Sequence, residues 1–155
     1  MAMLTSPALE FVMEARVTIG PAIDIGVTPR GERRIIPITG GTFEGPGLRG
    51  SVVPGGADWQ IIRADGATEL EARYTLSMET GGLIYVLNQG LRYGSPEVLR
   101  ALRDGLSVDR SRYYFRTAPV FETAVPELEW MMRSIFIGDA ERFADHVAIR
   151  FWRVE

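Results

Sequence analysis

The chain has 155 residues, 46% of them hydrophobic, which is enough for one domain with a substantial core. Its 17 basic and 20 acidic residues give a net charge of -3, which offers nucleic acid no overall attraction. Cysteine and lysine are absent and there is one histidine, which excludes disulfides, thiolate and Schiff-base catalysis, and a multi-histidine metal site. We expect no cofactor, and a calcium site built only from carboxylates is the one metal site left open.

The N-terminus has neither a basic segment nor a long apolar segment, so it does not resemble a signal peptide. No apolar run approaches the roughly 20 residues that a membrane-spanning helix needs. We therefore expect a single cytoplasmic domain over residues 1–155, with no membrane partner and with a flexible N-terminus over residues 1–8.

The first third of the chain predicts strands separated by glycine-rich turns. Apolar and polar residues alternate over 9–19, which is typical of a strand with one buried face. Over 23–38, glycines and prolines interrupt short apolar pieces and predict a loop with one or two short strands. The glycine-rich residues 40–47 predict a sharply bent strand, and 48–53 predict another strand that ends before Pro54.

The rest of the chain predicts more strands and one helix. Asp65-Gly66 between strand-like runs predicts a hairpin, and Ser95 and Gly105 are the cap residues of a helix over 96–104. Residues 128–136 fit both helical and strand spacing, and we favour a short turn followed by a strand. Further strands are expected over 83–93, 113–123 with an interruption at Pro119, and 147–154. The predicted fold class is all-β, an antiparallel β-barrel of about eight to ten strands with one short helix, and a sandwich is the alternative.

Two features of the sequence are weak evidence for a functional site. Residues 45–50 match the dinucleotide-binding pattern G-x-G-x-x-G, but the following residues cannot begin the helix that this site needs. His146, the only histidine, opens a predicted strand and is more typical of a barrel rim than of a catalyst.

Several polar residues within predicted strands are candidates for a binding site. The turn before Asp58 and Trp59 can bring backbone amides to a ligand, although Asp58 can equally cap local amides. Asn88, the only asparagine, lies in an apolar strand and needs a specific hydrogen bond, to protein or to ligand.

Arginines in predicted strands must face water or pair with an acidic group, and Arg73, Arg92 and Arg116 are of this kind. The alternation over 68–79 is explained most simply by a solvated outer face that includes Arg73. If that polar face lines the barrel instead, Arg73 and Arg116 become binding groups for a carboxylate or an enolate.

Six ordered segments carry a resemblance to a known family, namely residues 40–46, 54–59, 72–74, 88–90, 114–116 and 121–123. From about Phe11 to the C-terminus they resemble the bacterial and fungal domain-of-unknown-function family 3237. The resemblance implies a compact β-barrel and supplies no activity. Family members often carry Trp-Leu-Asn where this chain has Trp130-Met131-Met132. The polar positions that match are Glu44, Asp58, Arg73, Asn88, Arg116 and Glu122, and their use as a pocket is a hypothesis.

We expect a cofactor-independent acid–base enzyme, a lyase, isomerase or cyclase, acting on a small organic acid or an aromatic carbonyl compound. Asp58, Glu44 or Glu122 would be the general base, with a pKa raised by burial. The expected substrate-binding residues are Arg73, Asn88, Arg116, Trp59, Tyr74 and Tyr114. The alternatives are a non-catalytic barrel that binds a small ligand and a structural homo-oligomer without a pocket, formed through an apolar outer strand face.

Overall fold

The computed structural model describes residues 3–155, and strands account for most of them. Their bounds are β1 (Leu9–Ile19), β2 (Ile23–Thr28), β3 (Gly31–Gly45), β4 (Leu48–Ile62), β5 (Thr68–Met78), β6 (Leu83–Gly94), β7 (Tyr113–Thr123), β8 (Ile135–Arg142) and β9 (His146–Val154). The helical elements are α1 (Pro96–Arg103) and two short 3₁₀ helices, η1 (Arg110–Arg112) and η2 (Pro126–Arg133).

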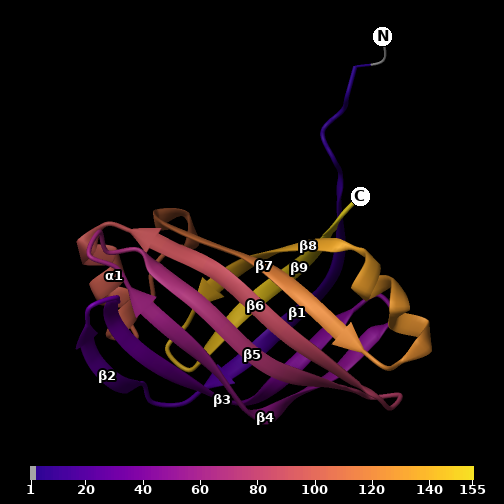
Figure 1. Cartoon of the computed structure of the whole chain (residues 1–155), viewed down its shortest axis with the longest axis horizontal. Helices are drawn as coiled ribbons and strands as arrows, with labels where there is room; N and C mark the ends of the chain where they lie inside the picture. The colour runs from indigo at the N-terminus through magenta and orange to yellow at the C-terminus, as the bar shows by residue number, and fades with distance from the viewer. Residues whose placement is uncertain (1–2) are drawn as a thin grey trace.

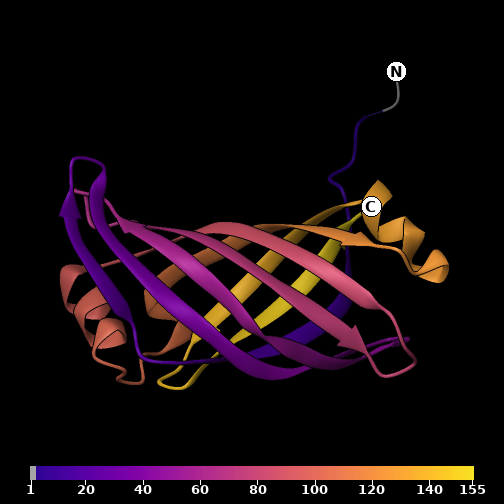
Figure 2. The same cartoon turned by 60° about the horizontal axis from the view of Figure 1, so that its bottom comes forward.

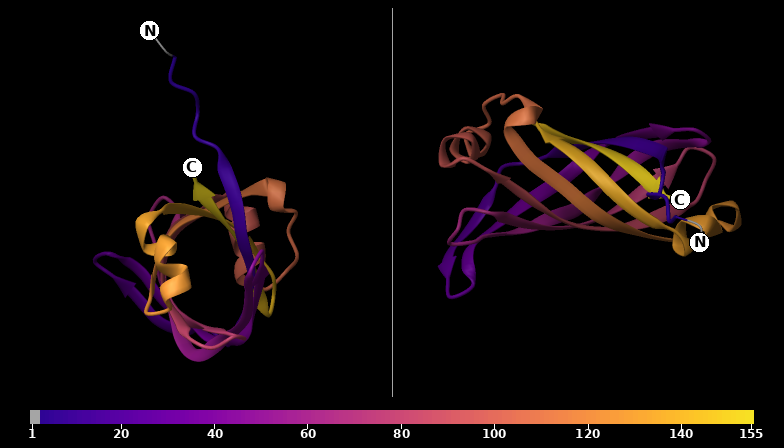
Figure 3. Two further views of the ribbon diagram at one scale, coloured as in Figure 1. Left: turned by 90° about the vertical axis from the view of Figure 1, so that its right-hand side faces the viewer. Right: turned by 90° about the horizontal axis from the view of Figure 1, so that it is seen from above.

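The strands form one antiparallel sheet in the order β1-β9-β8-β7-β6-β5-β4-β3-β2, and β1 also pairs with β3. This second pairing closes eight strands into a barrel and leaves β2 as an additional strand beside β3 (Figure 1). The view along the barrel shows the closed ring of strands (Figure 3, left). The predicted all-β barrel is therefore confirmed. The predicted flexibility of residues 1–8 concerns in part residues 1 and 2, which lie outside the described residues.

Local sequence signals predicted several elements well. The hairpin at Asp65-Gly66 is present, and its backbone is fastened by the Arg63 N–H donating to the Ala67 carbonyl at 2.9 Å. Helix α1 begins after Ser95, whose hydroxyl accepts a hydrogen bond from the Val98 N–H at 3.2 Å. The G-x-G-x-x-G match forms the turn between β3 and β4, with no helix after it.

Other boundaries differ from the predictions. Residues 31–45 form one long strand rather than short pieces, and β4 continues through 54–56 with a shift in its register to β5. Pro119 does not interrupt β7, and a 3₁₀ helix replaces the turn expected before β8. In each strand, pairing with neighbours on both sides outweighs the local preference of glycine and proline.

Barrel closure depends on a close approach between β1 and β3. The first part of β3 pairs with β2, and the later part, from Ile38 to Glu44, pairs with β1. Gly41 lies within the segment that pairs with β1, opposite Val17, and has a φ of 130°. A Cβ at this position would lie 2.0 Å from the Arg16 carbonyl oxygen, so only glycine allows the two strands to meet here.

The two ends of the barrel are covered by different helical elements. η2 lies at one end and α1 at the other (Figures 1 and 2). The η2 half is filled by buried aromatic side chains, including Phe121. The centroid of its ring lies 5.0 Å from that of Phe136 and 5.4 Å from that of Phe151, and both pairs pack edge to face. No helix within residues 3–155 is long and apolar enough to cross a membrane.

Replacing Gly41 by alanine should strongly destabilise the barrel. Gly55 is the matched control, because its φ of 111° is also positive but nothing lies within 4 Å of an added Cβ. We expect Gly55→Ala to cost about 1–2 kcal/mol for its backbone conformation alone, and Gly41→Ala to cost about 1–3 kcal/mol more for the clash. Urea unfolding measures both, and equal losses for the two variants would contradict the close-approach argument.

Candidate functional site

A cavity of about 50 Å³ lies inside the barrel, on the α1 side of the aromatic core. Strand β6 leads into α1, so its residues Asn88 and Arg92 line the cavity while Ile84 lies in the apolar half. Aliphatic side chains and Phe115 form much of the wall. Seven polar residues complete it: Asp58, Gln60, Tyr74, Asn88, Arg92, Thr117 and Arg142. A larger hollow of about 1020 Å³, beside Glu44 and Arg49, is open to solvent on the outer surface.

Strand alternation turns these polar side chains inward, and two glycines leave space between them. Thr117 is paired with Gly90 on β6 and with Gly138 on β8. A Cβ on Gly138 would lie 2.0 Å from the Thr117 hydroxyl oxygen. The two glycines therefore leave room for the Thr117 side chain, whose methyl group would lie 2.6 Å from a Cβ on Gly90.

Arg92 is the most unusual group in the cavity. The residue is only 7% exposed, and its Nε and Nη1 atoms have no hydrogen-bond partner. Among residues 3–155, no carboxylate lies within ion-pair distance of its guanidinium, which lies over the Phe115 ring at 5.4 Å. Burial lowers the pKa of Arg92 to about 10, so the group stays protonated at neutral pH.

Asp58 supplies the carboxylate of the cavity. Its two oxygens accept hydrogen bonds from Gln60 Nε2 at 2.8 Å and from the Glu71 backbone N–H at 3.0 Å. Burial raises the pKa of Asp58, and the Gln60 hydrogen bond and the Arg92 charge oppose this effect only in part. Asp58 is partly buried and lines the cavity. A carboxylate with a raised pKa in such a position is suited to accept a proton from a bound molecule.

Arg142 makes the cavity electropositive. Its guanidinium donates to the carbonyls of Phe143 and Ala144 in the hairpin between β8 and β9, and burial lowers its pKa. Two guanidiniums and one carboxylate therefore line the same small space. An anion is the ligand that balances this arrangement.

Three of the predicted site residues line the cavity: Asp58, Tyr74 and Asn88. Six do not, because they lie on the outer surface: Glu44, Trp59, Arg73, Tyr114, Arg116 and Glu122. Asp58 and Arg73 therefore point to opposite sides of the wall. We expected these six residues to face the same interior as Asp58, but the strand alternation turns them outward. The simpler interpretation, a solvated outer face, fits Arg73.

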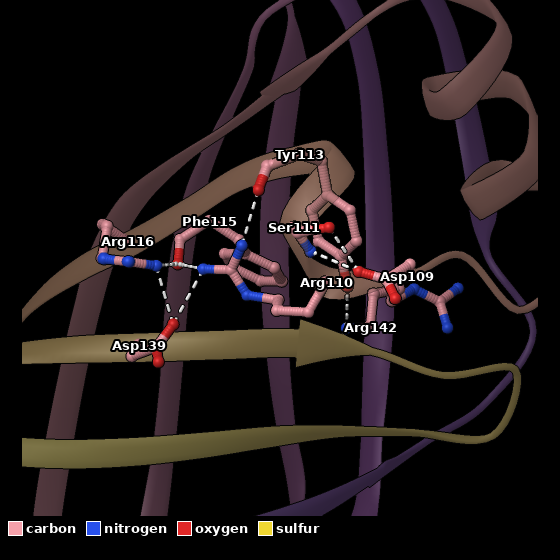
Figure 4. A network of polar contacts seen from close by, with 8 residues as sticks. All are labelled: Asp109, Arg110, Ser111, Tyr113, Phe115, Arg116, Asp139 and Arg142. Atoms are coloured by element: carbon pink, nitrogen blue, oxygen red, sulfur yellow. Dashed lines mark hydrogen bonds and ion pairs between the residues drawn. The ribbon is translucent and has the colours of Figure 1, made fainter.

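The outward arginines have partners on the surface. Arg73 donates to the Tyr85 hydroxyl at 2.8 Å. Arg116 donates to Asp139 Oδ1 at 2.7 Å, and Arg110 donates to the same oxygen at 2.8 Å (Figure 4). This cluster joins β7 to β8 where only two residue pairs connect these strands. The placement of Arg116 is thus explained by the barrel wall.

Four residues that line the cavity were not among the predicted site residues: Gln60, Arg92, Thr117 and Arg142. Arg92 lies an even number of residues from Ile84, Val86 and Asn88 on β6, so its side chain is on the same, inward face of the strand. The alternating apolar pattern of 83–93 could therefore have predicted that Arg92 points inward. Thr117 similarly shares the parity of Phe115 on β7. His146 contacts Asp145 at 2.7 Å and does not line the cavity.

Comparison with known proteins places this barrel in a family. The family model described as "Protein of unknown function (DUF3237)" matches residues 7–154. The chain belongs to this family. Met132, at the position where family members often carry asparagine, is 45% exposed on η2, so this corner is not part of the cavity.

Relatives in the family resemble the chain over almost its whole length. UPF0311 protein RPA1785 of Rhodopseudomonas palustris is 45% identical over 146 residues, covering 93% of this chain and 95% of the relative. The crystal structure of RPA1785 matches with a TM-score of 0.93 and 41% identity, covering 98% of this chain and 100% of that one.

A more distant relative is named as an enzyme. The hydroalkoxylation enzyme phnH of Penicillium herquei is 33% identical over 82 residues, covering 53% of this chain and 54% of that protein. The crystal structure of an enzyme from Penicillium herquei matches with a TM-score of 0.73 and 22% identity, covering 99% of this chain and 98% of that one, which shows a shared fold.

Replacing Asp58 by asparagine should stabilise the protein at neutral pH. Because burial raises the pKa of Asp58 in the folded state, wild-type stability is lost as pH rises from the ordinary carboxyl range through this raised value. Asp58→Asn removes the buried charge, and the Gln60 amide can reverse so that its unpaired Oε1 accepts from the new amide. Urea unfolding should therefore show a gain at about pH 8 that disappears near about pH 4.

The exposed Glu122→Gln is the control and should show no such pH-dependent gain. If Asp58→Asn is less stable than the wild type at every pH, Asp58 is a structural group and the stability argument fails.

Proposed function

We propose that the barrel is a cofactor-independent enzyme that transfers a proton on a small organic acid. In this proposal Arg92 binds the acid group of the substrate and Asp58 is the general base. The observation that carries the proposal is Arg92 itself, a buried, charged guanidinium with two unpaired nitrogens beside a carboxylate of raised pKa in one cavity.

The unpaired guanidinium of Arg92 is a reason to propose an anionic ligand. Burying a charged group is costly unless a partner of opposite charge is near, and arginines with a structural role normally have one. Arg110 shows this in the same chain, since it pairs with Asp139 and with two backbone carbonyls. A substrate carboxylate would give Arg92 the two parallel hydrogen bonds that its planar geometry favours.

Asp58 supports proton transfer rather than binding alone. A C–H proton next to a carbonyl group would move to the Asp58 carboxylate, while the C–H electron pair forms a carbon–carbon double bond and charge moves to the carbonyl oxygen. The distant relative phnH is named a hydroalkoxylation enzyme. Adding an O–H group across a double bond is likewise balanced by proton movement alone, so this name favours acid–base chemistry over passive ligand binding.

The size of the cavity favours the small organic acid over an aromatic substrate. A cavity needs about 10–15 Å³ to hold one water, so the cavity of about 50 Å³ has room for roughly three to five waters. At about 30 Å³ of liquid volume each, these waters fill roughly 90–150 Å³, which is the size of a short-chain acid. Cavities that hold drug-sized molecules measure about 300–1,000 Å³.

The short keto acid levulinate tests the proposal. In heavy water the protein should catalyse deuterium incorporation next to the levulinate ketone, observed by NMR, and calorimetry gives the dissociation constant. Arg92→Met should weaken binding by about 10- to 100-fold, the value of a charged hydrogen-bonded pair. Asp58→Asn should keep binding and lose the exchange, because it retains the shape of the site without the base.

Arg133→Met, which removes an exposed arginine paired with Glu129 on η2, is the matched control and should change neither quantity. Unchanged binding by Arg92→Met would contradict the anion site. Binding by the wild type without any exchange would instead support the non-catalytic ligand-binding barrel.

A further inference from the structure

We propose that the cavity has a second, neutral subsite, formed by Tyr74, Asn88 and Thr117, which binds a ketone or hydroxyl oxygen of the substrate. This inference rests on the proposed function for the acid end of the substrate. It narrows the substrate class to short acids that carry a second, uncharged oxygen away from the carboxylate.

The three residues come from three neighbouring strands and share one feature. Each is almost completely buried, with 3% exposure for Tyr74 and Asn88 and 7% for Thr117. The Tyr74 hydroxyl, Asn88 Oδ1 and Thr117 Oγ1 atoms have no hydrogen-bond partner, and all three residues line the cavity. Buried polar atoms in proteins are nearly always paired, so three unpaired ones around one space indicate a polar ligand there.

The chemistry of the three groups favours an uncharged oxygen. Burial and the nearby Asp58 charge raise the pKa of Tyr74, so its hydroxyl keeps its proton and can donate a hydrogen bond. Thr117 also offers a hydroxyl, and the Asn88 amide offers both donors and an acceptor. None of the three carries a positive charge, and the Asp58 carboxylate nearby disfavours a second acid group.

The barrel wall accommodates the Thr117 side chain between two glycines, and Thr117 lines the cavity. Its cross-strand partners are Gly90 and Gly138, and the hydroxyl occupies the position that a Cβ of residue 138 would take. Pairing across the sheet also places the subsite near the base. Asp58 is opposite Ala72, which is opposite Asn88, so Asp58 and Asn88 lie in one row two strands apart.

This position matches the demands of the proposed proton transfer. A carbonyl oxygen held by Tyr74 and Thr117 would make the neighbouring C–H group acidic at the place where Asp58 can receive its proton. The Tyr74 hydroxyl would donate to that oxygen as negative charge develops on it. When the proton returns from Asp58 to carbon, the oxygen regains its carbonyl double bond and no other reactant is consumed.

The test compares two ligands that differ only in the neutral oxygen, levulinate and valerate, which has the same carbon chain without the ketone. Calorimetry should show that the wild type binds levulinate roughly threefold to tenfold more tightly, the contribution of about one hydrogen bond. Thr117→Val and Asn88→Leu should remove most of this preference while leaving the dissociation constant of valerate unchanged. Thr117→Ser keeps the hydroxyl and should keep the preference.

The outcomes separate this inference from the proposed function. If valerate binds and Arg92→Met weakens it, but the wild type does not prefer levulinate, the neutral subsite is overturned while the anion site stands. If neither acid binds the wild type, the proposed function fails, and the subsite with it. Thermal unfolding of each variant shows that it is folded, and a preference retained in folded Thr117→Val and Asn88→Leu would also overturn the inference.

Discussion

A closed antiparallel barrel divides its side chains strictly into those that face the interior and those that face outward. The pairing of β1 with β3 imposes this division here, and it encloses Arg92 and Asp58 together. Inside the barrel a charge cannot be solvated by bulk water, so its partners must come from the wall or from a bound molecule. The excess of guanidinium over carboxylate in the cavity is therefore the feature that gives the site its chemical character.

Within the interior, the hydrophobic core and the candidate site are separated along the barrel axis. The η2 half is packed with aromatic and aliphatic side chains, among them Phe121 and Met131, and provides the hydrophobic stabilisation. The α1 half contains buried polar atoms that lack partners and thus costs stability. A solid apolar half allows the chain to retain a polar half in which several groups are not paired with one another.

Much of the fold can be predicted from the alternation of apolar and polar residues. The candidate site can be predicted from the same alternation only when the inward face of every strand is known. The pattern over 9–19 and the caps of α1 were sufficient to predict those elements. The continuity of β3 and β4 was not predictable locally, because their glycines and prolines are accommodated by pairing with neighbouring strands. Asp58, Tyr74 and Asn88, which were predicted from composition and context, line the cavity, whereas Arg92 lines it but was not predicted as a site residue. Only the tertiary pairing of Arg116 with Asp139 shows why an arginine in a strand can be purely structural.

The position of Gly138 has a consequence for how such barrels can diversify. The atoms nearest to a methyl group there would be side-chain atoms, Thr117 Oγ1 at 2.0 Å and Ile149 Cγ2 at 3.4 Å, whereas a methyl group at Gly90 would meet the Arg116 backbone oxygen at 2.4 Å. Residue 138 can therefore vary at little cost to the framework, provided that residue 117 varies with it. Exchanging this pair would change the volume of the cavity beside residue 117 and leave Arg92 and Asp58 in place.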